Sequence, residues 1–278
     1  MKILIVGAKG MLGQELAGAF NNNELILWDR EDLDIVNSAM VRERITELKP
    51  DLIINSAAYN LVDEAENNPI VAYEVNYEGP KNLARVAKDL DACLIHYGTD
   101  YVFDGARQTG YDEDHPTHPV SNYGRSKLAG EQAVRTIGGK YYIIRPSRIF
   151  GRPAASEGAK KSFVDVMRTL AETKTELTVV HEEMASPTYA PDLAQLTKYV
   201  FDQQLPFGLY HGANDGACTW HEFAQEIFRL LHKNINLIPV PTAHFPRPAQ
   251  RPAFSQLLNT KLPKQRSWQE ALKEYLNG

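Results

Sequence analysis

The sequence predicts an α/β protein, in which a doubly wound parallel sheet of the Rossmann type is followed by a smaller C-terminal α/β lobe. Three observations support this fold class. A short apolar run leads into a glycine-rich turn and a helical pattern, strand and helix patterns then alternate to about residue 150, and the alternation loosens beyond that point. We therefore expect a first domain over residues 1–150 and a second lobe over residues 151–278, with later segments returning to the first domain.

The beginning of the chain has the pattern of a dinucleotide-binding unit. Lys2–Val6 is rich in β-branched residues and predicts a buried strand, and Gly7, Gly10 and Gly13 follow with the spacing G-x-x-G-x-x-G before a helical run. Gly7 permits a tight turn, Gly10 lets the backbone approach a pyrophosphate, and Gly13 lets helix and strand pack closely. The helix N-terminus offers free amides to the same phosphates. The alternative is a glycine turn that binds no ligand.

A second strand, predicted over residues 25–28, ends in Asp29 and Arg30. An acid at this place accepts hydrogen bonds from the adenosine ribose hydroxyls, whereas an arginine faces the 2′-phosphate of NADPH. Because both residues are present, the choice between NADH and NADPH stays open. Asp34 and Ile35 come next and could border the adenine, although Asp34 would serve equally well as a helix-capping or loop acid.

The third and fourth strands end in residues suited to a ligand site. The third, over residues 51–54, is followed by Ala57 and Ala58, which are small enough for the chain to pass under a cofactor. The fourth, over residues 92–97, leads to Thr99. Ligands of open parallel sheets bind at the carboxyl ends of the strands, so we expect chemistry at Thr99.

The spacing of apolar residues predicts the remaining helices and strands in the same way. A helical stretch over 70–89 precedes the fourth strand, and a long polar loop over 104–119 follows it. We then expect a helix from Ser121 and a fifth strand over 141–144. The second half predicts helices near 161–173, 191–203, 219–231 and 267–277, strand-like pieces at 177–180, 208–211 and 236–240, and an irregular proline-rich segment between residues 239 and 252.

Tyr123 and Lys127 lie four residues apart on the helix that begins at Ser121, which brings both side chains onto one face. An ammonium beside a phenol favours the phenolate and lowers the tyrosine pKa, so the tyrosine can give or take a proton near neutral pH. The Thr99 hydroxyl can hold the same substrate oxygen. These three residues predict the transfer of a hydride to or from a carbonyl. Tyr-x-x-x-Lys alone is common on solvated helix faces, and the dinucleotide-binding pattern is what favours catalysis.

Composition limits the remaining function classes. The chain has 278 residues, 43% of them hydrophobic and 23% charged, without an apolar stretch of membrane-spanning length or a signal-peptide pattern. Cys93 and Cys218 suggest no disulfide framework, and the histidines show no metal-ligand spacing, so no metal is expected. A net charge of −5 argues against nucleic acid or an anionic membrane as partner. We expect a cytoplasmic protein.

The charge distribution is uneven. Between residues 145 and 174 the sequence has seven basic residues against the three acids Glu157, Asp165 and Glu172. A positive stretch within an acidic chain suits a small phosphorylated ligand. A solvated basic face would explain it equally well.

Six segments together resemble the dTDP-4-dehydrorhamnose reductase family of the extended short-chain dehydrogenase/reductase superfamily. They run through nearly the whole chain: Gly7–Gly13, Asn55–Tyr59 with Val62–Asp63, Thr99–Gly105, Tyr123–Glu131, Ser186–Thr188 and Arg251–Pro252. The resemblance implies an NADPH- or NADH-dependent reductase that acts on the C4 ketone of a nucleotide-linked deoxysugar, with dTDP-4-dehydrorhamnose as substrate and dTDP-L-rhamnose as product. It leaves a homodimer open.

The resemblance also assigns roles to individual residues. Thr99, Tyr123 and Lys127 match the catalytic residues: Tyr123 would protonate the ketone, and Lys127 would also hold the nicotinamide ribose. Asn76 matches an asparagine that shapes the site in related proteins, or it only bonds the backbone. Substrate-binding residues would be Val62, Thr99, Tyr101 and Arg148. The cofactor would be bound by Gly7, Gly10, Met11, Leu12, Gly13, Asp29, Arg30, Asp34, Ile35, Ala57, Ala58, Tyr59, Tyr123 and Lys127.

Two departures from the family pattern concern the sugar. After the fifth strand the family has Arg-Thr-Ser-Trp with the tryptophan packed on the sugar, whereas this chain has Arg145-Pro146-Ser147-Arg148. Asn60 stands where the family has threonine. These exchanges leave the hydride-transfer chemistry in place but put the identity of the sugar in doubt.

Three alternatives remain beside the reductase. A sugar-nucleotide dehydratase would need a glutamate after Asp100, where this chain has Tyr101, so elimination is disfavoured. A 4-epimerase uses the same threonine, tyrosine and lysine but keeps its cofactor bound. A non-catalytic binding subunit can share the fold, because fold alone does not fix function.

Overall fold

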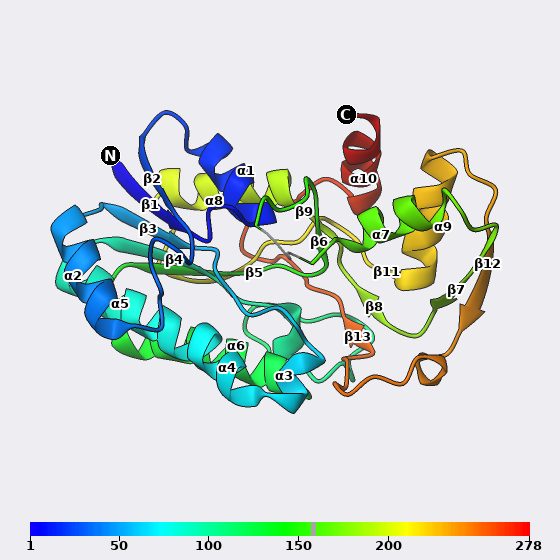
Figure 1. Cartoon of the computed structure of the whole chain (residues 1–278), viewed down its shortest axis with the longest axis horizontal. Coiled ribbons are helices and arrows are strands. Elements are labelled where there is room, and N and C mark those ends of the chain that lie inside the picture. The colour runs from blue at the N-terminus through cyan, green and yellow to red at the C-terminus, as the bar shows by residue number, and fades with distance from the viewer. Residues whose placement is uncertain (157–159) are drawn as a thin grey trace.

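The computed structural model describes residues 1–156 and 160–278. Its centre is a six-stranded sheet with the order β10-β5-β4-β3-β1-β2, in which every neighbouring pair is parallel (Figure 1). The strands are β1 (Lys2–Val6), β2 (Glu24–Trp28), β3 (Leu52–Asn55), β4 (Cys93–Tyr97), β5 (Tyr141–Arg145) and β10 (Gly208–His211). The strand order reverses between β1 and β3, and the carboxyl ends at such a switch point are the usual ligand site of this architecture.

Helices cover both faces of the sheet, which confirms the expected doubly wound α/β class. On one face lie α1 (Met11–Ala19) and α8 (Ala190–Asp202), and on the other α2 (Ser38–Leu48), α5 (Gly79–Asp89) and α6 (Asn122–Ile137) (Figure 1). The helix α2 was not predicted from the sequence. Its N-cap is Asn37, whose side chain accepts a hydrogen bond from the Met40 amide.

The alternation of side chains along each strand builds two buried layers. In β1, Ile3 and Ile5 pack with Leu16 of α1, while Leu4 and Val6 point to the opposite layer. These four side chains are almost fully buried. A strand with both faces covered reads as a continuous apolar run, which is the pattern from which the strand was predicted.

The helical stretch expected over 70–89 is divided by a π-helical segment. It consists of α4 (Pro69–Tyr73), the π-helix η1 (Glu74–Glu78) and α5, and a short helix α3 (Glu64–Asn67) precedes it. A π-turn widens the helix by one residue and often occurs at functional sites. Here it contains Asn76, which is buried against α6.

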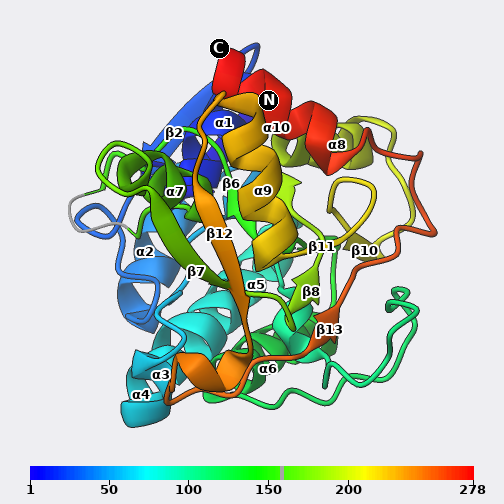
Figure 2. The same ribbon diagram turned by 90° about the vertical axis from the view of Figure 1, so that its right-hand side faces the viewer.

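The C-terminal lobe has its own core. The strands β7 (Glu176–Val180) and β12 (Asn236–Val240) form a parallel pair beside α7 (Phe163–Leu170), α9 (Trp220–Leu230) and α10 (Trp268–Asn277) (Figure 2). Capping boxes begin α9 at Thr219 with Glu222 and α10 at Ser267 with Glu270.

Short strands connect the lobe to the central sheet. β11 (Cys218–Thr219), β8 (Met184–Ala185) and β13 (Phe254–Ser255) form a small sheet, and β6 (Ile149–Phe150) pairs with β9 (Thr188–Tyr189). These connecting strands were not predicted, because two-residue strands carry no periodicity. The predicted piece at 208–211 is β10 of the central sheet. Since α8 and β10 pack on the central sheet, the division near residue 150 stays a prediction.

Two short 3-10 helices complete the secondary structure: η2 (Asp100–Val102) directly after β4, and η3 (Thr242–His244) after β12. The segment between η3 and β13, residues 245–253, crosses from the lobe to the loop after β3. There the Ala249 amide donates to Asp63 Oδ1 at 3.2 Å and Arg251 pairs with the same carboxylate. We call residues 245–253 the crossing segment.

Candidate active site

Thr99 and Tyr123 meet at the carboxyl end of β4. Thr99 is the N-cap of η2: its hydroxyl accepts from the Tyr101 amide and donates to Asp100 Oδ1, both at 3.3 Å. The Tyr123 phenol adjoins the Thr99 hydroxyl and donates to Asn60 Oδ1 at 3.4 Å. Asn60, which stood out only as a departure from the family pattern, therefore lies beside the expected proton donor.

The close approach of α6 to η2 depends on two local features. Ser121 caps the helix by accepting from the Gly124 amide at 3.1 Å, which starts the helix at Asn122, one residue before Tyr123. A Cβ at Gly124 would lie 2.3 Å from the Tyr101 carbonyl oxygen, so only glycine lets the first turn of α6 pass this close. The rings of Tyr101 and Tyr123 then meet edge to face, with centroids 5.5 Å apart.

Burial shifts the pKa values of Tyr123 and Lys127 in opposite directions. It raises the pKa of the Tyr123 phenol above its ordinary value, with the Thr99 hydroxyl lowering the pKa in part. It lowers the pKa of the Lys127 ammonium to about 8. Lys127 Nζ donates to the carbonyl oxygen of Tyr97 at 2.6 Å. The sequence suggested that Lys127 would depress the tyrosine pKa, but in this structure burial outweighs any such effect.

Asp100 and Ser255 support the site from beneath, and the sequence did not single out either residue for this role. Asp100 is 3% exposed, and its carboxylate accepts from Ser255 Oγ of β13 at 2.6 Å. Burial raises the pKa of this carboxyl, and hydroxyl donors including Ser255 oppose the rise. The pair ties β13 to the Thr99 turn over a separation of 155 residues.

Asn76 joins three parts of the site through one amide. Its Oδ1 accepts from the Tyr59 amide at 2.9 Å, and its Nδ2 donates to the Tyr59 carbonyl and to Ser126 Oγ, each at 3.0 Å. Asn76 thus bonds the backbone, as one of its two interpretations expected. Through these bonds it holds the segment after β3 against α6.

Val62 and Tyr101, two of the expected substrate-binding residues, pack beside Tyr123 in a small apolar cluster that includes Ala65 and Ala72. This brings the expected substrate wall and the expected proton donor together. The direct substrate contacts of Val62, Thr99 and Tyr101 stay predictions.

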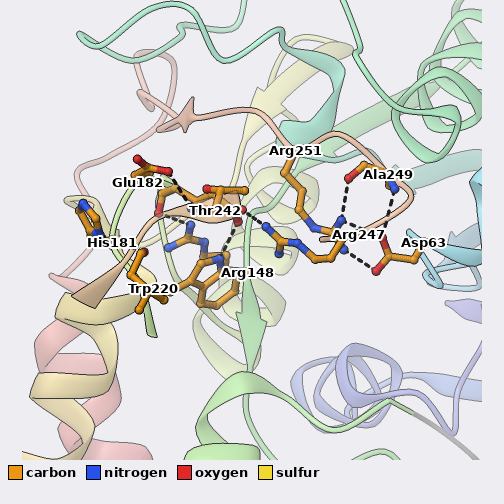
Figure 3. Close-up of polar contacts among 11 residues, drawn as sticks. Asp63, Arg148, His181, Glu182, Trp220, Thr242, Arg247, Ala249 and Arg251 are labelled. Carbon is orange, nitrogen blue, oxygen red and sulfur yellow. Dashed lines mark hydrogen bonds and ion pairs between the residues drawn. The ribbon is translucent and has the colours of Figure 1, made fainter. Parts of the chain in front are cut away.

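Arg148 lies at the border of the site in a different setting from the one expected. Its two terminal nitrogens donate to the carbonyl oxygens of Cys218 at 2.8 Å and Glu183 at 2.7 Å, and its guanidinium lies over the Trp220 ring (Figure 3). Burial lowers its pKa, while Asp100 and Tyr101 are close enough to oppose this. Several of its donors are thus already used within the protein, and a contact with the sugar stays a prediction.

Two arginines of the crossing segment add ion pairs next to Arg148. Arg247 pairs with Glu183, which also accepts from Trp220 Nε1 at 3.0 Å, and Arg251 forms a two-pronged pair with Asp63 (Figure 3). Arg251 lowers the pKa of the Asp63 carboxyl. Asp63 and Arg251 both lie in segments that resemble the family, but nothing in the sequence indicated that they pair.

Two arginines of the basic stretch between residues 145 and 174 pair with acids elsewhere in the chain. Arg145 donates from Nε and Nη2 to the carboxylate of buried Glu131, with the shortest contact at 2.6 Å. Arg152 Nε lies 3.5 Å from Glu15 Oε1. Glu157, one of the acids counted in this stretch, lies outside the described residues. The ligand interpretation of this stretch stays a prediction.

The glycine turn fits a dinucleotide phosphate. Gly7 has a φ of 77°, and a Cβ at Gly13 would lie 2.2 Å from the Gly7 carbonyl oxygen, so both positions require glycine for the turn and for the packing of α1. Gly10 is the N-cap of α1 and has no side chain that could cap the helix amides. The Gly10 amide donates to the Gly7 carbonyl at 3.0 Å, so Met11 and Leu12 present the first amides of the helix at the switch point of the sheet.

The expected adenosine side of the cofactor site is held by backbone contacts. The Asp29 carboxylate accepts from the amides of Lys9 at 3.0 Å and Arg30 at 2.8 Å. Asp34 accepts from the Val36 amide at 3.0 Å, as a loop acid does, and Ile35 is buried in the core. Ala57, Ala58 and Tyr59 continue from β3 in the same region. Their contacts with a cofactor stay predictions.

Some site types find no support in the part of the chain that the structure describes. Within residues 1–156 and 160–278, no helix is long and apolar enough to cross a membrane, and no group of three or more His, Cys, Asp or Glu side chains could hold a metal ion. A broad depression of about 1100 Å³ lies at the opposite, amino-terminal end of the strands, lined by residues such as Lys49, Asp91 and Phe207. It includes none of the expected site residues.

Comparisons with known proteins show the family of this chain. The chain matches the family described as "RmlD substrate binding domain" over residues 1–278. It is 40% identical to a dTDP-4-dehydrorhamnose reductase of Clostridium acetobutylicum, with a TM-score of 0.94 and coverage of 100% of this chain and 99% of that one. It is 36% identical to a dTDP-4-dehydrorhamnose reductase of Bacillus anthracis solved in complex with NADP, with a TM-score of 0.94 and coverage of 99% of this chain and 98% of that one.

The name of a third relative indicates a different substrate. It is the "Probable dTDP-4,6-dihydroxy-2-methyloxan-3-one 4-ketoreductase" of Streptomyces antibioticus, which is 38% identical and covers 99% of this chain and 94% of the relative. The match over the full length of the chain confirms the family resemblance seen in the sequence. This protein belongs to the RmlD substrate binding domain family.

Proposed function

We propose that this protein is an NAD(P)H-dependent reductase of the C4 ketone of a nucleotide-linked deoxysugar, with dTDP-4-dehydrorhamnose as the first candidate substrate. The observation that carries the proposal is the convergence of the Thr99 and Tyr123 hydroxyls at the carboxyl end of β4, with Lys127 on the same helix. The full-length similarity to reductases that bear this name supports the substrate class.

Tyr123 is the proposed proton donor. A reduction needs the phenol protonated when the ketone arrives, and the raised pKa keeps the Tyr123 phenol protonated at neutral pH. The Thr99 hydroxyl adjoins that phenol and can donate to the same ketone oxygen. Its present partner, Asp100, accepts at 3.3 Å, which is a weak bond that the substrate can replace.

Lys127 is the proposed electrostatic partner of the reaction. Its bond to the Tyr97 carbonyl uses one of three ammonium donors and leaves two for ribose hydroxyls. A buried positive charge on the same face of α6 also stabilises the phenolate that remains after Tyr123 has given its proton. The bound nicotinamide would supply the hydride, while the glycine turn and the first amides of α1 would hold the cofactor diphosphate.

The identity of the sugar is the least determined part of the proposal. Dehydration is disfavoured because it needs a glutamate after Asp100, where this chain has Tyr101. Burial also raises the pKa of the Tyr101 phenol to about 12. A 4-epimerase and a non-catalytic subunit share the arrangement. The Streptomyces antibioticus relative supports other dTDP-linked ketosugars as a second candidate class. A cytoplasmic setting and a homodimer belong to the same proposal.

The deciding experiment measures NADPH and NADH oxidation by the purified protein against a panel of nucleotide-linked 4-keto sugars, with Tyr123→Phe as the matched control. The proposal expects net cofactor oxidation with at least one sugar and its loss in the variant. Conversion of the sugar without net oxidation would indicate an epimerase. No conversion of any sugar, with binding intact, would favour the non-catalytic subunit.

A further inference from the structure

Glu131 is a buried acid on α6 that the proposed reaction does not use. Tyr123, Lys127 and Glu131 follow one another at intervals of four residues, so their side chains lie on one face of the helix. The Glu131 side chain is 1% exposed. A carboxylate that is removed from water needs compensating charge, and Glu131 lies one turn beyond the Lys127 ammonium.

Arg145 of β5 holds the Glu131 carboxylate in one orientation. Its Nε donates to Oε1 at 3.0 Å and to Oε2 at 3.1 Å, and its Nη2 donates to Oε2 at 2.6 Å. The Arg145 side chain is also buried, and its guanidinium carbon lies 5.3 Å from the centroid of the Phe103 ring. Because the planar guanidinium binds both carboxylate oxygens, the negative charge of Glu131 is fixed at one point.

The same carboxylate borders the end of β4 directly before Thr99. A Cβ at Gly98 would lie 2.1 Å from Glu131 Oε1, so a side chain at this position would displace the carboxylate. One turn earlier on α6, Lys127 Nζ donates to the Tyr97 carbonyl at 2.6 Å. Two successive turns of α6 therefore hold two successive residues of the chain, and the next residue is Thr99.

The titratable groups that face Lys127 come from α6 and β4. Glu131 raises the pKa of the ammonium and so opposes burial, which lowers this pKa to about 8. On β4, burial and the charge of Lys127 lower the pKa of His96, so its imidazole is neutral at neutral pH. Burial likewise keeps the Tyr123 phenol neutral by raising its pKa. Glu131 is thus the acid that acts on the ammonium.

We infer that Glu131, clamped by Arg145, is a positioning residue for the proposed reduction: its carboxylate keeps the Lys127 ammonium charged and fixes the end of β4 that leads to Thr99. The inference rests on the proposed role of Lys127 and adds the group on which that role depends. A neutral amine at Lys127 would stabilise the Tyr123 phenolate less than an ammonium does.

The test follows the titration of Lys127 itself, by NMR of the full-length chain with ¹³C at the lysine Cε. The signal is assigned by its absence in Lys127→Met. Glu131→Leu with Arg145→Met replaces the buried pair by apolar side chains of similar size, a change that often leaves stability intact. Glu131→Gln is the second variant. Glu226→Leu with Arg229→Met, which removes an ion pair of α9, is the matched control.

We expect the titration midpoint of Lys127 to fall by about one pH unit in Glu131→Leu with Arg145→Met, because the nearer of the two charges is the acid. It should fall further in Glu131→Gln, where the Arg145 charge remains. The alkaline limb of kcat should move with the midpoint, so the double variant loses less than about twofold at pH 6 and about fivefold at pH 8. The α9 control should keep the wild-type midpoint.

An unchanged Lys127 midpoint in a folded variant would overturn the inference, because Glu131 would then serve only the fold. A kcat that falls equally at every pH would overturn it as well. Loss of folding in both variants, seen by circular dichroism, would likewise assign the pair to the fold alone. The titration needs no turnover, so a wild type that oxidises neither NADPH nor NADH would contradict the proposed function and leave this measurement standing.

Discussion

The Arg148 guanidinium lies over the indole of Trp220, with its central carbon 3.8 Å from the ring centroid. The φ of Arg148 is 44°, a left-handed conformation that is unfavourable for a residue with a side chain. Its bonds to the carbonyls of Glu183 and Cys218 hold it there. Where the family has a tryptophan that packs on the sugar, this chain thus has an arginine joined to β8, β11 and α9.

The first prediction concerns this arginine. Arg148→Lys should lower the free energy of unfolding by about 1–3 kcal/mol, because one ammonium cannot serve both carbonyls or stack as a plane on Trp220. Thermal or urea denaturation measures the change. An unchanged stability would mean that the contacts of Arg148 matter little to the fold.

The function of the same residue is tested by Arg148→Trp, which restores the family residue. We expect a lower kcat/KM for dTDP-4-dehydrorhamnose, since an indole placed on Trp220 would overpack the site and leave two carbonyls without donors. Kinetics should be compared only after the variant is shown to be folded. A gain in kcat/KM would mean that the chain is adapted to another sugar.

A second prediction concerns the proton donor. Tyr123→Phe removes one hydroxyl from a packed site, so the fold and the cofactor Kd should stay close to those of the wild type. Turnover should fall by about 10²- to 10⁴-fold, the usual contribution of a general acid. Steady-state kinetics and cofactor titration measure the two effects. A variant with near wild-type turnover at neutral pH would remove Tyr123 from this role.

A third prediction follows from the buried ammonium of Lys127. Its pKa is lowered to about 8, so between pH 8 and its ordinary value near 10.5 the folded chain has lost a proton that the unfolded chain still holds. Stability rises with pH wherever the unfolded state binds more protons. Lys127 should therefore cost stability below pH 8, and this cost should fade as the pH rises above 8.

Lys127→Met tests this linkage. The variant should be more stable than the wild type at pH 7, and the difference should shrink between pH 8 and pH 10, while turnover is lost throughout. Melting temperatures across this range give the answer. A difference that does not depend on pH would show that the Lys127 ammonium is not penalised by burial.

A fourth prediction concerns the two residues at the end of β2. Asp29→Ala should shift preference toward NADPH and Arg30→Ala toward NADH, because an acid favours ribose hydroxyls and a base favours the 2′-phosphate. Since Asp29 also holds the Lys9 amide, Asp29→Ala should weaken both cofactors, NADH more strongly. If neither substitution moves the ratio of the two Kd values, Asp29 and Arg30 lie outside the cofactor site.

The parts of the fold that local sequence specifies were predictable. The glycine turn is encoded by Gly7 and Gly13, whose positions exclude a side chain, and the spacing of Tyr123 and Lys127 follows from one helix. Burial of β1 on both faces gives the apolar run from which the sheet was predicted. In each case the determinant lies within a few residues of the feature.

The rest of the site depends on contacts between distant segments. Ser255 reaches Asp100 across 155 residues, and Arg251 reaches Asp63 across 188. The bond of Lys127 to the Tyr97 carbonyl depends on how α6 lies on β4, and no spacing in the sequence encodes it. The depressed tyrosine pKa was wrongly expected for the same reason, because burial of Tyr123 arises only from the assembled site.

The central claim is that hydride passes from the cofactor to the C4 ketone of a nucleotide-linked sugar while Tyr123 supplies the proton. The most direct test incubates the protein with dTDP-4-dehydrorhamnose and NADPH deuterated at the transferable position, and locates the label in the sugar by NMR. The account predicts one deuterium at C4 for each NADPH oxidised, and labelling slowed by about 10²- to 10⁴-fold with Tyr123→Phe. A sugar that changes at C4 without label or net oxidation, or unaltered labelling in Tyr123→Phe, would contradict it.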